Sequence, residues 1–217
     1  RPQQMAMSLA NLGYRVFYLS TTFHGSSGVP GFNIVESPHE NIFVCELYCP
    51  SPHPIIYDSI SDAEQAIALS RGLDLLKSNF HCSRVVEVVQ HPFWRQVVAR
   101  SQGATVLYDC MDHHAGFSTA TEDLLVQEEL LFEQADLVVT TSSELSRIVE
   151  KHRDNVVIRN AAEGEHFCKR PATLPFDKTR PVVGYFGAIS EWFDSALLAR
   201  AARRFSEWDF VLVGDTY

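Results

Sequence analysis

Short apolar runs alternate along the chain with longer segments in which apolar residues recur every three or four positions. The short runs predict β-strands and the periodic segments predict amphipathic helices. We expect strands at residues 15–20, 41–48, 84–90, 104–110, 136–140 and 155–158, followed by one beginning at 182 and one at 209–214. We expect helices at residues 2–12, 61–77, 93–101, 121–134, 143–152 and 195–205. This order predicts an α/β fold, a Rossmann-like parallel sheet with helices on both faces and functional groups at the carboxyl ends of its strands.

Local patterns add detail at three places along the chain. Ser61 followed by Glu64 matches a capping box, so the helix is expected to open at residue 61. Residues 21–38 are rich in Gly, Ser and Pro, which predicts a loop. Asp194 stands just ahead of the last periodic segment and is suited to cap that helix.

The chain divides into two parts of unequal length. Residues 1–162 carry most of the expected strands, whereas residues 163–180 include two prolines, lack periodicity and predict a linker. Residues 181–217 predict the first strand–helix–strand of a second, truncated Rossmann-like domain. A helix that leads into a parallel strand normally follows an earlier strand, so we expect the first strand of the N-terminal domain to be missing.

Composition narrows the class of protein. The net charge is −9, with 27 acidic and 18 basic residues, and there is no basic run that could track phosphates, so nucleic acid is not an expected partner. Five scattered cysteines without a C-x-x-C pair indicate reduced thiols in a cytoplasmic protein. No apolar run approaches the roughly 18 residues that a membrane-spanning helix needs.

A glycine-containing turn, residues 184–190, precedes the last helix. Free backbone N–H groups and the positive end of the helix dipole could bind a phosphate there. The spacing is not G-x-G-x-x-G, and Glu191 and Asp194 add negative charge at the same place. Packing of a strand end is the alternative explanation for these glycines. For Trp192 and Phe193 nearby we expect packing in a core or between domains.

Acidic and histidine residues gather after the strand at 104–110. Asp109, Asp112, His113 and His114 could perform acid–base chemistry or bind a metal, but their spacing matches no known zinc pattern. Solvated or capping roles are the alternative for these histidines. His91 ends the neighbouring strand, where a structural turn with the following proline is the alternative to a functional role.

Several stretches occur together in a characteristic order. They are Arg1-Pro-Gln-Gln with Arg15-Val-Phe-Tyr, Tyr108-Asp-Cys-Met-Asp112, the segment 135–142, the segment 159–167, the turn 184–190 and the strand 210–214. This set resembles the GT-B glycosyltransferases, especially the bacterial branch near glycosyltransferase families 1 and 4. Two features depart from the family: residues 161–163 replace its Gly-Val-Asp, and its acidic Glu-x7-Glu segment and basic diphosphate-binding residues would lie beyond residue 217.

The resemblance implies metal-independent transfer of a sugar from a nucleotide-sugar donor to an acceptor, with no further cofactor, in a cleft between two domains. It implies His113 as the catalytic residue that approaches the donor sugar, with His114 as the alternative and Asp112 beside them. Donor binding would involve four residues of the glycine turn, Gly184, Gly187, Ala188 and Ser190. The acceptor side would include His91 and Asp109.

The expected partners follow from the same resemblance. They are a nucleotide-sugar and a carbohydrate or lipid-linked acceptor of polysaccharide biosynthesis, which would bring peripheral contact with a membrane. As part of a longer chain the protein would be an enzyme, and residues 1–217 alone are expected to be inactive. Two alternatives stay open: a non-catalytic carbohydrate- or partner-binding protein of the same fold, and a sugar-nucleotide epimerase, which the opening Arg-Pro-Gln and the stretch at 108–112 disfavour.

Overall fold

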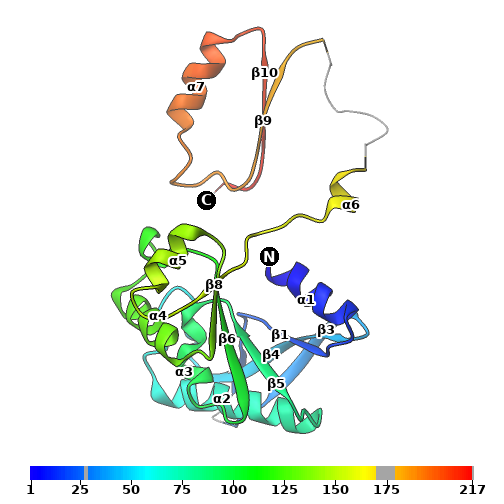
Figure 1. The fold of residues 1–217 in the computed structure, drawn as a ribbon, viewed down its shortest axis with the longest axis vertical. Helices are drawn as coiled ribbons and strands as arrows, with labels where there is room; N and C mark the ends of the chain where they lie inside the picture. The colour runs from blue at the N-terminus through cyan, green and yellow to red at the C-terminus, as the bar shows by residue number, and fades with distance from the viewer. Residues whose placement is uncertain (27–28, 170–178, 217) are drawn as a thin grey trace. The chain divides into compact units, whose positions relative to one another are not determined.

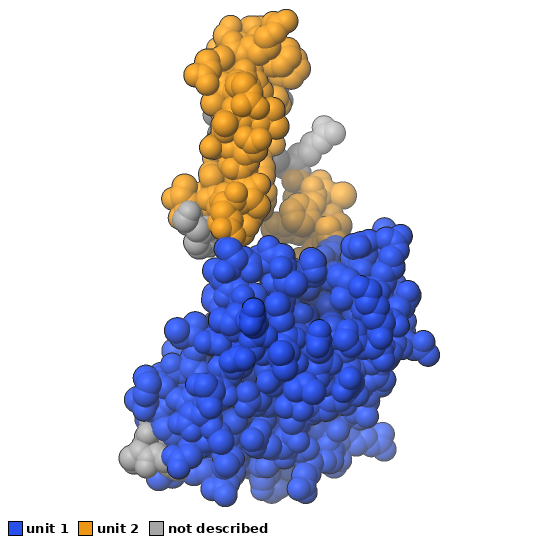
Figure 2. Space-filling model, turned by 90° about the vertical axis from the view of Figure 1, so that its left-hand side faces the viewer, with its two compact units in different colours: residues 1–161 blue, residues 162–217 orange. Residues whose placement is uncertain are grey.

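A computed structural model describes residues 1–26, 29–169 and 179–216 as an α/β protein with parallel strands (Figure 1). The chain forms two compact units, Arg1–Ala161 and Ala162–Tyr217 (Figure 2). Among the described residues, no helix is both long enough and apolar enough to cross a membrane.

Unit 1 begins with one helix and a four-stranded mixed sheet. Two strands run parallel to β4 and the third, β3, pairs with it antiparallel. The elements are α1 (Pro2–Asn11), β1 (Val16–Leu19), β2 (His24–Ser26), β3 (Phe32–His39) and β4 (Ile42–Pro50). This first sheet is therefore not purely parallel.

The expected loop at 21–38 is wrong, because β2 and most of β3 lie within it. Pairing with the apolar strand β4 overrides the local turn composition, and Tyr48 Oη of β4 donates a hydrogen bond of 2.9 Å to Asn33 Oδ1 of β3. Pro38 is tolerated because, among the described strands, β3 pairs with β4 alone.

The rest of unit 1 is a run of helices and strands that forms a second sheet, in the order β5-β6-β7-β8, with every pair parallel. Its strands are β5 (Val85–Val89), β6 (Ala104–Cys110), β7 (Leu137–Thr140) and β8 (Val156–Val157). Its helical elements are α2 (Ala63–Asn79), η1 (Pro92–Trp94), α3 (Arg95–Val98), η2 (His114–Gly116), α4 (Glu122–Gln134) and α5 (Ser143–Val149). A short 3-10 turn and a short helix thus replace the single helix expected at 93–101.

Side-chain caps fix where the longer helices begin. The cap of α2 is Asp62 rather than the expected Ser61, since Asp62 Oδ1 accepts a hydrogen bond of 2.8 Å from the N–H of Glu64. Thr121 caps α4 by accepting from the N–H of Leu124 at 3.2 Å. The observed helix α2 therefore starts later than the predicted residue 61, but the same apolar positions form its buried face.

Three apolar clusters among the described residues hold unit 1 together. The first joins β4 to α2 through Cys45, Leu47 and Leu69, and the second joins β6 and β7 to α4 and α5 through Tyr108 and other buried residues. Each fully buried large apolar side chain contributes roughly 1.5–3 kcal/mol. Helix α1 covers the opposite face of the first sheet with its small residues Ala6 and Ala10, which contact Ile42.

Unit 2 is one parallel strand–helix–strand with a short helix ahead of it. Its elements are α6 (Gly164–Phe167), β9 (Val182–Phe186), α7 (Ser195–Arg204) and β10 (Asp209–Val213), with β9 and β10 paired in parallel. The expected linker at 163–180 contains α6, and its residues 170–178 lie outside the described part of the chain.

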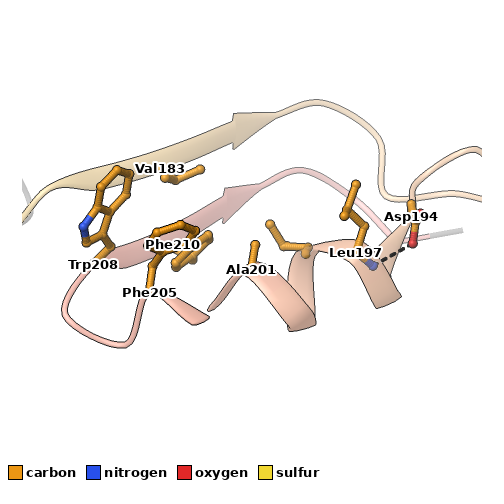
Figure 3. A pocket seen from close by; sticks show the side chains of 8 residues that line it. Val183, Asp194, Leu197, Ala201, Phe205, Trp208 and Phe210 are labelled. Atoms are coloured by element: carbon orange, nitrogen blue, oxygen red, sulfur yellow. Dashed lines mark hydrogen bonds between the residues drawn. The ribbon is translucent and has the colours of Figure 1, made fainter. Parts of the chain in front are cut away.

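The described residues of unit 2 include none that is buried. Its apolar side chains instead line an open groove between α7 and the two strands (Figure 3). Trp208 lies at one end, with its ring centroid 5.2 Å from that of Phe205. Two strands and one helix are too little to enclose a core.

Candidate functional site

The carboxyl ends of β5 and β6 bring together most of the predicted site residues of unit 1. The two strands are neighbours, so His91, just after β5, and the segment from Asp109 to His114 at the end of β6 reach the same edge. Their environments differ greatly, and the differences decide which side chains could contact a ligand.

Asp109 is held by other side chains of unit 1. It is 1% exposed, and its carboxylate accepts hydrogen bonds from Arg1 Nε at 3.0 Å, Arg1 Nη2 at 2.7 Å and Gln90 Nε2 at 2.9 Å. Arg1 Nη1 also donates to Asn160 Oδ1 at 2.9 Å and to the carbonyl of Ile158 at 3.3 Å. A bidentate arginine–carboxylate pair is a strong, directional contact. Asp109 therefore anchors the start of α1, and its carboxylate is not presented to solvent for an acceptor.

His114 belongs to a buried hydrogen-bonded group on the inner side of this edge. Its Nδ1 lies 2.9 Å from Glu128 Oε1, and Tyr108 Oη donates to the same oxygen at 2.6 Å. All three residues are buried. A carboxylate that binds one ring nitrogen of a histidine fixes the orientation of the imidazole.

Glu128 is the residue of this group that sequence analysis did not single out. Its side chain lies on the buried face of α4, together with Leu124, Leu131 and Phe132. A carboxylate on the apolar stripe of an amphipathic helix is the signal that could have identified it, since such a group needs a buried partner.

His91 packs beside His114 and is held in its neutral form. Its Nδ1 accepts a hydrogen bond from the N–H of Phe93 at 3.3 Å, which caps the turn η1. The two imidazole centroids lie 5.0 Å apart with nearly perpendicular planes. Burial, with a smaller contribution from His114, lowers the pKa of His91 from 6.5 to about 4, against an opposing effect of Glu128. The single ring proton is therefore on Nε2.

His113 and Asp112 are exposed, in contrast to the adjacent His114. Gly116 lies close to the ring: a Cβ on this glycine would come within 3.4 Å of His113 Nδ1. The loop after β6 thus presents one histidine to solvent and holds the next one in the interior. Of the three catalytic candidates, His113 and Asp112 are exposed to a ligand, whereas His114 is not.

The remaining reactive side chains at this edge are unsuited to nucleophilic chemistry. Burial raises the pKa of the Cys110 thiol to about 12 and raises the pKa of Tyr108 well above its ordinary value, with Glu128 adding to both effects. Within the described ranges, no three His, Cys, Asp or Glu side chains are placed to hold a metal ion.

The glycine turn of unit 2 begins later than expected. Gly184 lies inside β9, so the loop proper starts at Gly187. The N–H of Gly187 donates to the carbonyl of Val213 at 3.0 Å and that of Ile189 donates to the carbonyl of Asp215 at 2.9 Å. Two of the backbone donors available to a phosphate are therefore already used.

Further contacts tie this loop to the end of β10. Gly187 has a φ of 153°, and Gly214, with a φ of 155°, packs directly on its carbonyl. Tyr185 Oη donates to the carbonyl of Ala188 at 2.8 Å. Asp194 caps α7 by accepting from the N–H of Leu197 at 2.7 Å, as expected. Ala188 and Ser190 remain the donor-site candidates whose N–H groups could approach an anion.

The chain matches no protein-family model, and no curated protein sequence is a significant match to it.

Proposed function

We propose that the chain is the acceptor-binding unit and the first part of the donor-binding unit of a glycosyltransferase that uses a nucleotide-sugar. The observation that carries the proposal is the loop after β6, where the exposed His113 is adjacent to the buried His114–Glu128 pair. The resemblance of the ordered sequence motifs to GT-B enzymes supports the same reading, as does a second parallel strand–helix–strand in unit 2.

His113 would bind a hydroxyl of the donor sugar. A neutral imidazole both donates and accepts hydrogen bonds, so it can hold a hydroxyl and stabilise charge that develops near it. His114 would act as a positioning residue, because its Nδ1 is engaged by Glu128 and its ring is buried. Fixing one histidine in the interior limits the conformations of the next and prepares it for binding.

In unit 2, the backbone N–H groups of Ala188 and Ser190 would face the donor diphosphate. A few preorganised backbone donors can bind phosphate oxygens without a metal ion. The hydrogen bonds that already engage Gly187 and Ile189 favour the competing proposal, a non-catalytic carbohydrate-binding protein. The two proposals differ in whether a nucleotide-sugar is turned over.

The test uses the full natural chain that contains this sequence. Uridine, guanosine and adenosine diphosphate sugars are incubated with and without saccharide acceptors, and nucleotide release and product formation are measured. We expect transfer with one donor class and a loss of kcat of about 100-fold in His113→Ala, the size of effect typical for one well-placed polar group, with unchanged thermal unfolding.

His81→Asn is the matched control. His81 is an exposed histidine in the turn before β5, at the other end of the sheet, and asparagine tolerates its φ of 50°. Normal turnover in His113→Ala would remove His113 from the mechanism. Donor binding without transfer would favour the non-catalytic protein, and isomerisation of the sugar without an acceptor would identify an epimerase.

A further inference from the structure

Aromatic rings follow one another at the edge formed by the carboxyl ends of β5 and β6. The ring centroid of Tyr57 lies 6.1 Å from that of His91. The ring centroid of Phe117 lies 6.5 Å from that of His114, which itself lies 5.0 Å from His91. The two outer rings are exposed, Tyr57 by 56% and Phe117 by 39%, whereas His91 is half-buried and His114 is buried. His91 and His114 therefore each have beside them an aromatic ring that solvent can reach.

Tyr57 belongs to the segment that joins β4 to α2, and this segment is held on both sides of the ring. Near its start, the buried Gln65 of α2 donates a hydrogen bond through Nε2 to the carbonyl of Pro52. Beyond Tyr57, Oδ1 of Asp58 accepts a hydrogen bond of 2.9 Å from Oγ1 of Thr121, the capping residue of α4. A side chain on a loop that is already fixed loses little conformational entropy when a ligand binds. The segment therefore presents Tyr57 as a preorganised surface.

A hydrogen-bond donor and an acceptor accompany this ring. His91 Nδ1 accepts from the N–H of Phe93, so the polar group left on its neutral imidazole is the Nε2–H donor. Asp58, next to Tyr57 in sequence, is half-buried, and its carboxylate has lone pairs beyond the one that Thr121 uses. Ligand sites typically combine an aromatic surface with a few fixed polar groups. A pyranose ring matches this combination, because it has faces of C–H groups and an edge of hydroxyls that donate and accept.

An apolar chain is the competing occupant of the same surface. Ile55 is 68% exposed on the segment that carries Tyr57, so an acyl or isoprenoid chain would find two apolar side chains to contact. Covering Asp58 and His91 with such a chain would also remove their polar groups from water without supplying a partner, which is unfavourable. A saccharide supplies a partner for both groups. The surface around Tyr57 therefore favours a saccharide over an apolar chain.

We propose that Tyr57 binds the apolar face of a saccharide ring, while a hydroxyl of the same ring accepts a hydrogen bond from Nε2–H of His91. Identifying this saccharide as the acceptor of the transfer rests on the proposed function, whereas the binding itself does not. The contact requires a ring face of C–H groups, which an open-chain polyol with similar hydroxyls does not offer. Tyr57 is then a specificity-determining residue for the acceptor, on a different segment from His113.

The test measures saccharide binding directly, with the full natural chain that contains this sequence and without a donor. Methyl β-glucoside, methyl β-galactoside and cellobiose are the saccharide probes. Sorbitol is the open-chain control, and farnesyl phosphate is the probe for an apolar chain. Affinity is read from ligand-observed NMR titrations. We expect the saccharides to bind and sorbitol and farnesyl phosphate not to compete with them.

Variants of Tyr57 separate stacking from other contributions of this side chain. We expect Tyr57→Ala to weaken saccharide binding about tenfold and Tyr57→Phe, which keeps the ring, to stay within about twofold of the parent chain. Tyr14→Ala is the matched control and should leave the affinity unchanged, since Tyr14 is 61% exposed but lies between α1 and the amino end of β1. Thermal unfolding midpoints verify that each variant is folded.

Three results would overturn the proposal. The first is saccharide binding that is absent, or equally strong in Tyr57→Ala and the parent chain. The second is a loss in Tyr57→Phe as large as that in Tyr57→Ala, because the hydroxyl rather than the ring would then be responsible. The third is Tyr57-dependent binding of sorbitol or farnesyl phosphate in place of the sugars.

The transfer assay distinguishes this binding site from the proposed function. Tyr57→Ala should raise the KM for the saccharide acceptor about tenfold and leave kcat unchanged, the pattern of a contact made equally in the ground state and the transition state. Tyr57-dependent binding in a chain that transfers no sugar would support the saccharide site and refute the transferase. Transfer with an unchanged acceptor KM in Tyr57→Ala would refute the saccharide site alone.

Discussion

Arg1 and Asp109 are 108 positions apart in sequence and are joined by two hydrogen bonds, of 2.7 and 3.0 Å, between a guanidinium and a nearly inaccessible carboxylate. The pair connects the beginning of α1 to the carboxyl end of β6. It also removes Asp109 from the set of side chains that could bind a ligand directly. We therefore infer that the carboxylate of Asp109 stabilises unit 1 and does not bind a ligand.

Replacing Asp109 by alanine is expected to lower the free energy of unfolding by about 3 kcal/mol, because Arg1 and Gln90 lose a buried acceptor. Urea denaturation followed by circular dichroism measures the change. Asp112→Ala, three residues along on the exposed loop, is the control and should cost less than about 0.5 kcal/mol. Equal effects of the two substitutions would refute the assignment.

Glu128→Ala is expected to destabilise unit 1 by about 2–4 kcal/mol, because it removes buried volume and leaves Tyr108 Oη and His114 Nδ1 without their shared acceptor. Exchange of the backbone amides at residues 112–116 should become faster as the loop loses its anchor. The exposed neighbour Glu129 provides the matched control, Glu129→Ala. Unchanged exchange of the amides in this loop would show that the His114–Glu128 pair does not position His113.

The stability of unit 1 should fall as the pH is lowered from 6.5 to 4. Over this range His91 becomes protonated in the unfolded chain. In the folded state burial keeps the pKa of His91 near 4, so its imidazole stays neutral over most of the range. The loss is complete once the pH is below both values, and the free energy of unfolding recovers as the pH rises again.

The variant His91→Asn isolates this contribution. Asparagine keeps an acceptor for the N–H of Phe93 at the cap of η1 but does not titrate. Denaturation midpoints at several pH values between 7 and 4 should show a smaller pH-dependent loss in the variant than in the parent chain. Parallel curves would exclude His91 as the source.

Gly214→Ala should disrupt the end of unit 2. A Cβ at this position would lie 1.9 Å from the carbonyl oxygen of Gly187, and the φ of 155° is unfavourable for alanine. We expect a loss of about 1–3 kcal/mol, the usual range for backbone strain, seen as faster exchange along β9 and β10 and altered fluorescence of Trp208. Gly184→Ala, where a Cβ meets nothing within 4 Å, should leave both unchanged.

Sequence patterns were sufficient for elements whose stability is largely local. Helix α4 begins one residue after the capping residue Thr121 and its periodic positions form its buried face, as apolar spacing predicts. Strand β3 could not be found in this way, because its pairing with β4 decides its conformation more than its own Pro38 does. Gly184 likewise lies within a strand, although the glycines of residues 184–190 suggested a turn.

The position of the candidate site in the fold could be predicted from the sequence, but the arrangement of its side chains could not. The histidines and acids at the ends of β5 and β6 indicate which edge matters. Glu128, 14 positions from His114, decides which of the two adjacent histidines is buried. Arg1 forms the hydrogen bonds that engage the carboxylate of Asp109. Partners so distant in sequence leave no periodic pattern, so only the tertiary structure distinguishes His113 from His114.

The bond between Arg1 and Asn160 has a consequence for the connectivity of unit 1. The first residue of the unit and one of its last lie within the reach of a single arginine side chain. A short linker could therefore close the chain into a ring at little entropic cost, and new ends could be opened at an exposed loop elsewhere. Unit 1 should tolerate circular permutation, since the order in which its segments are joined matters less to its packing than the contact that brings its ends together.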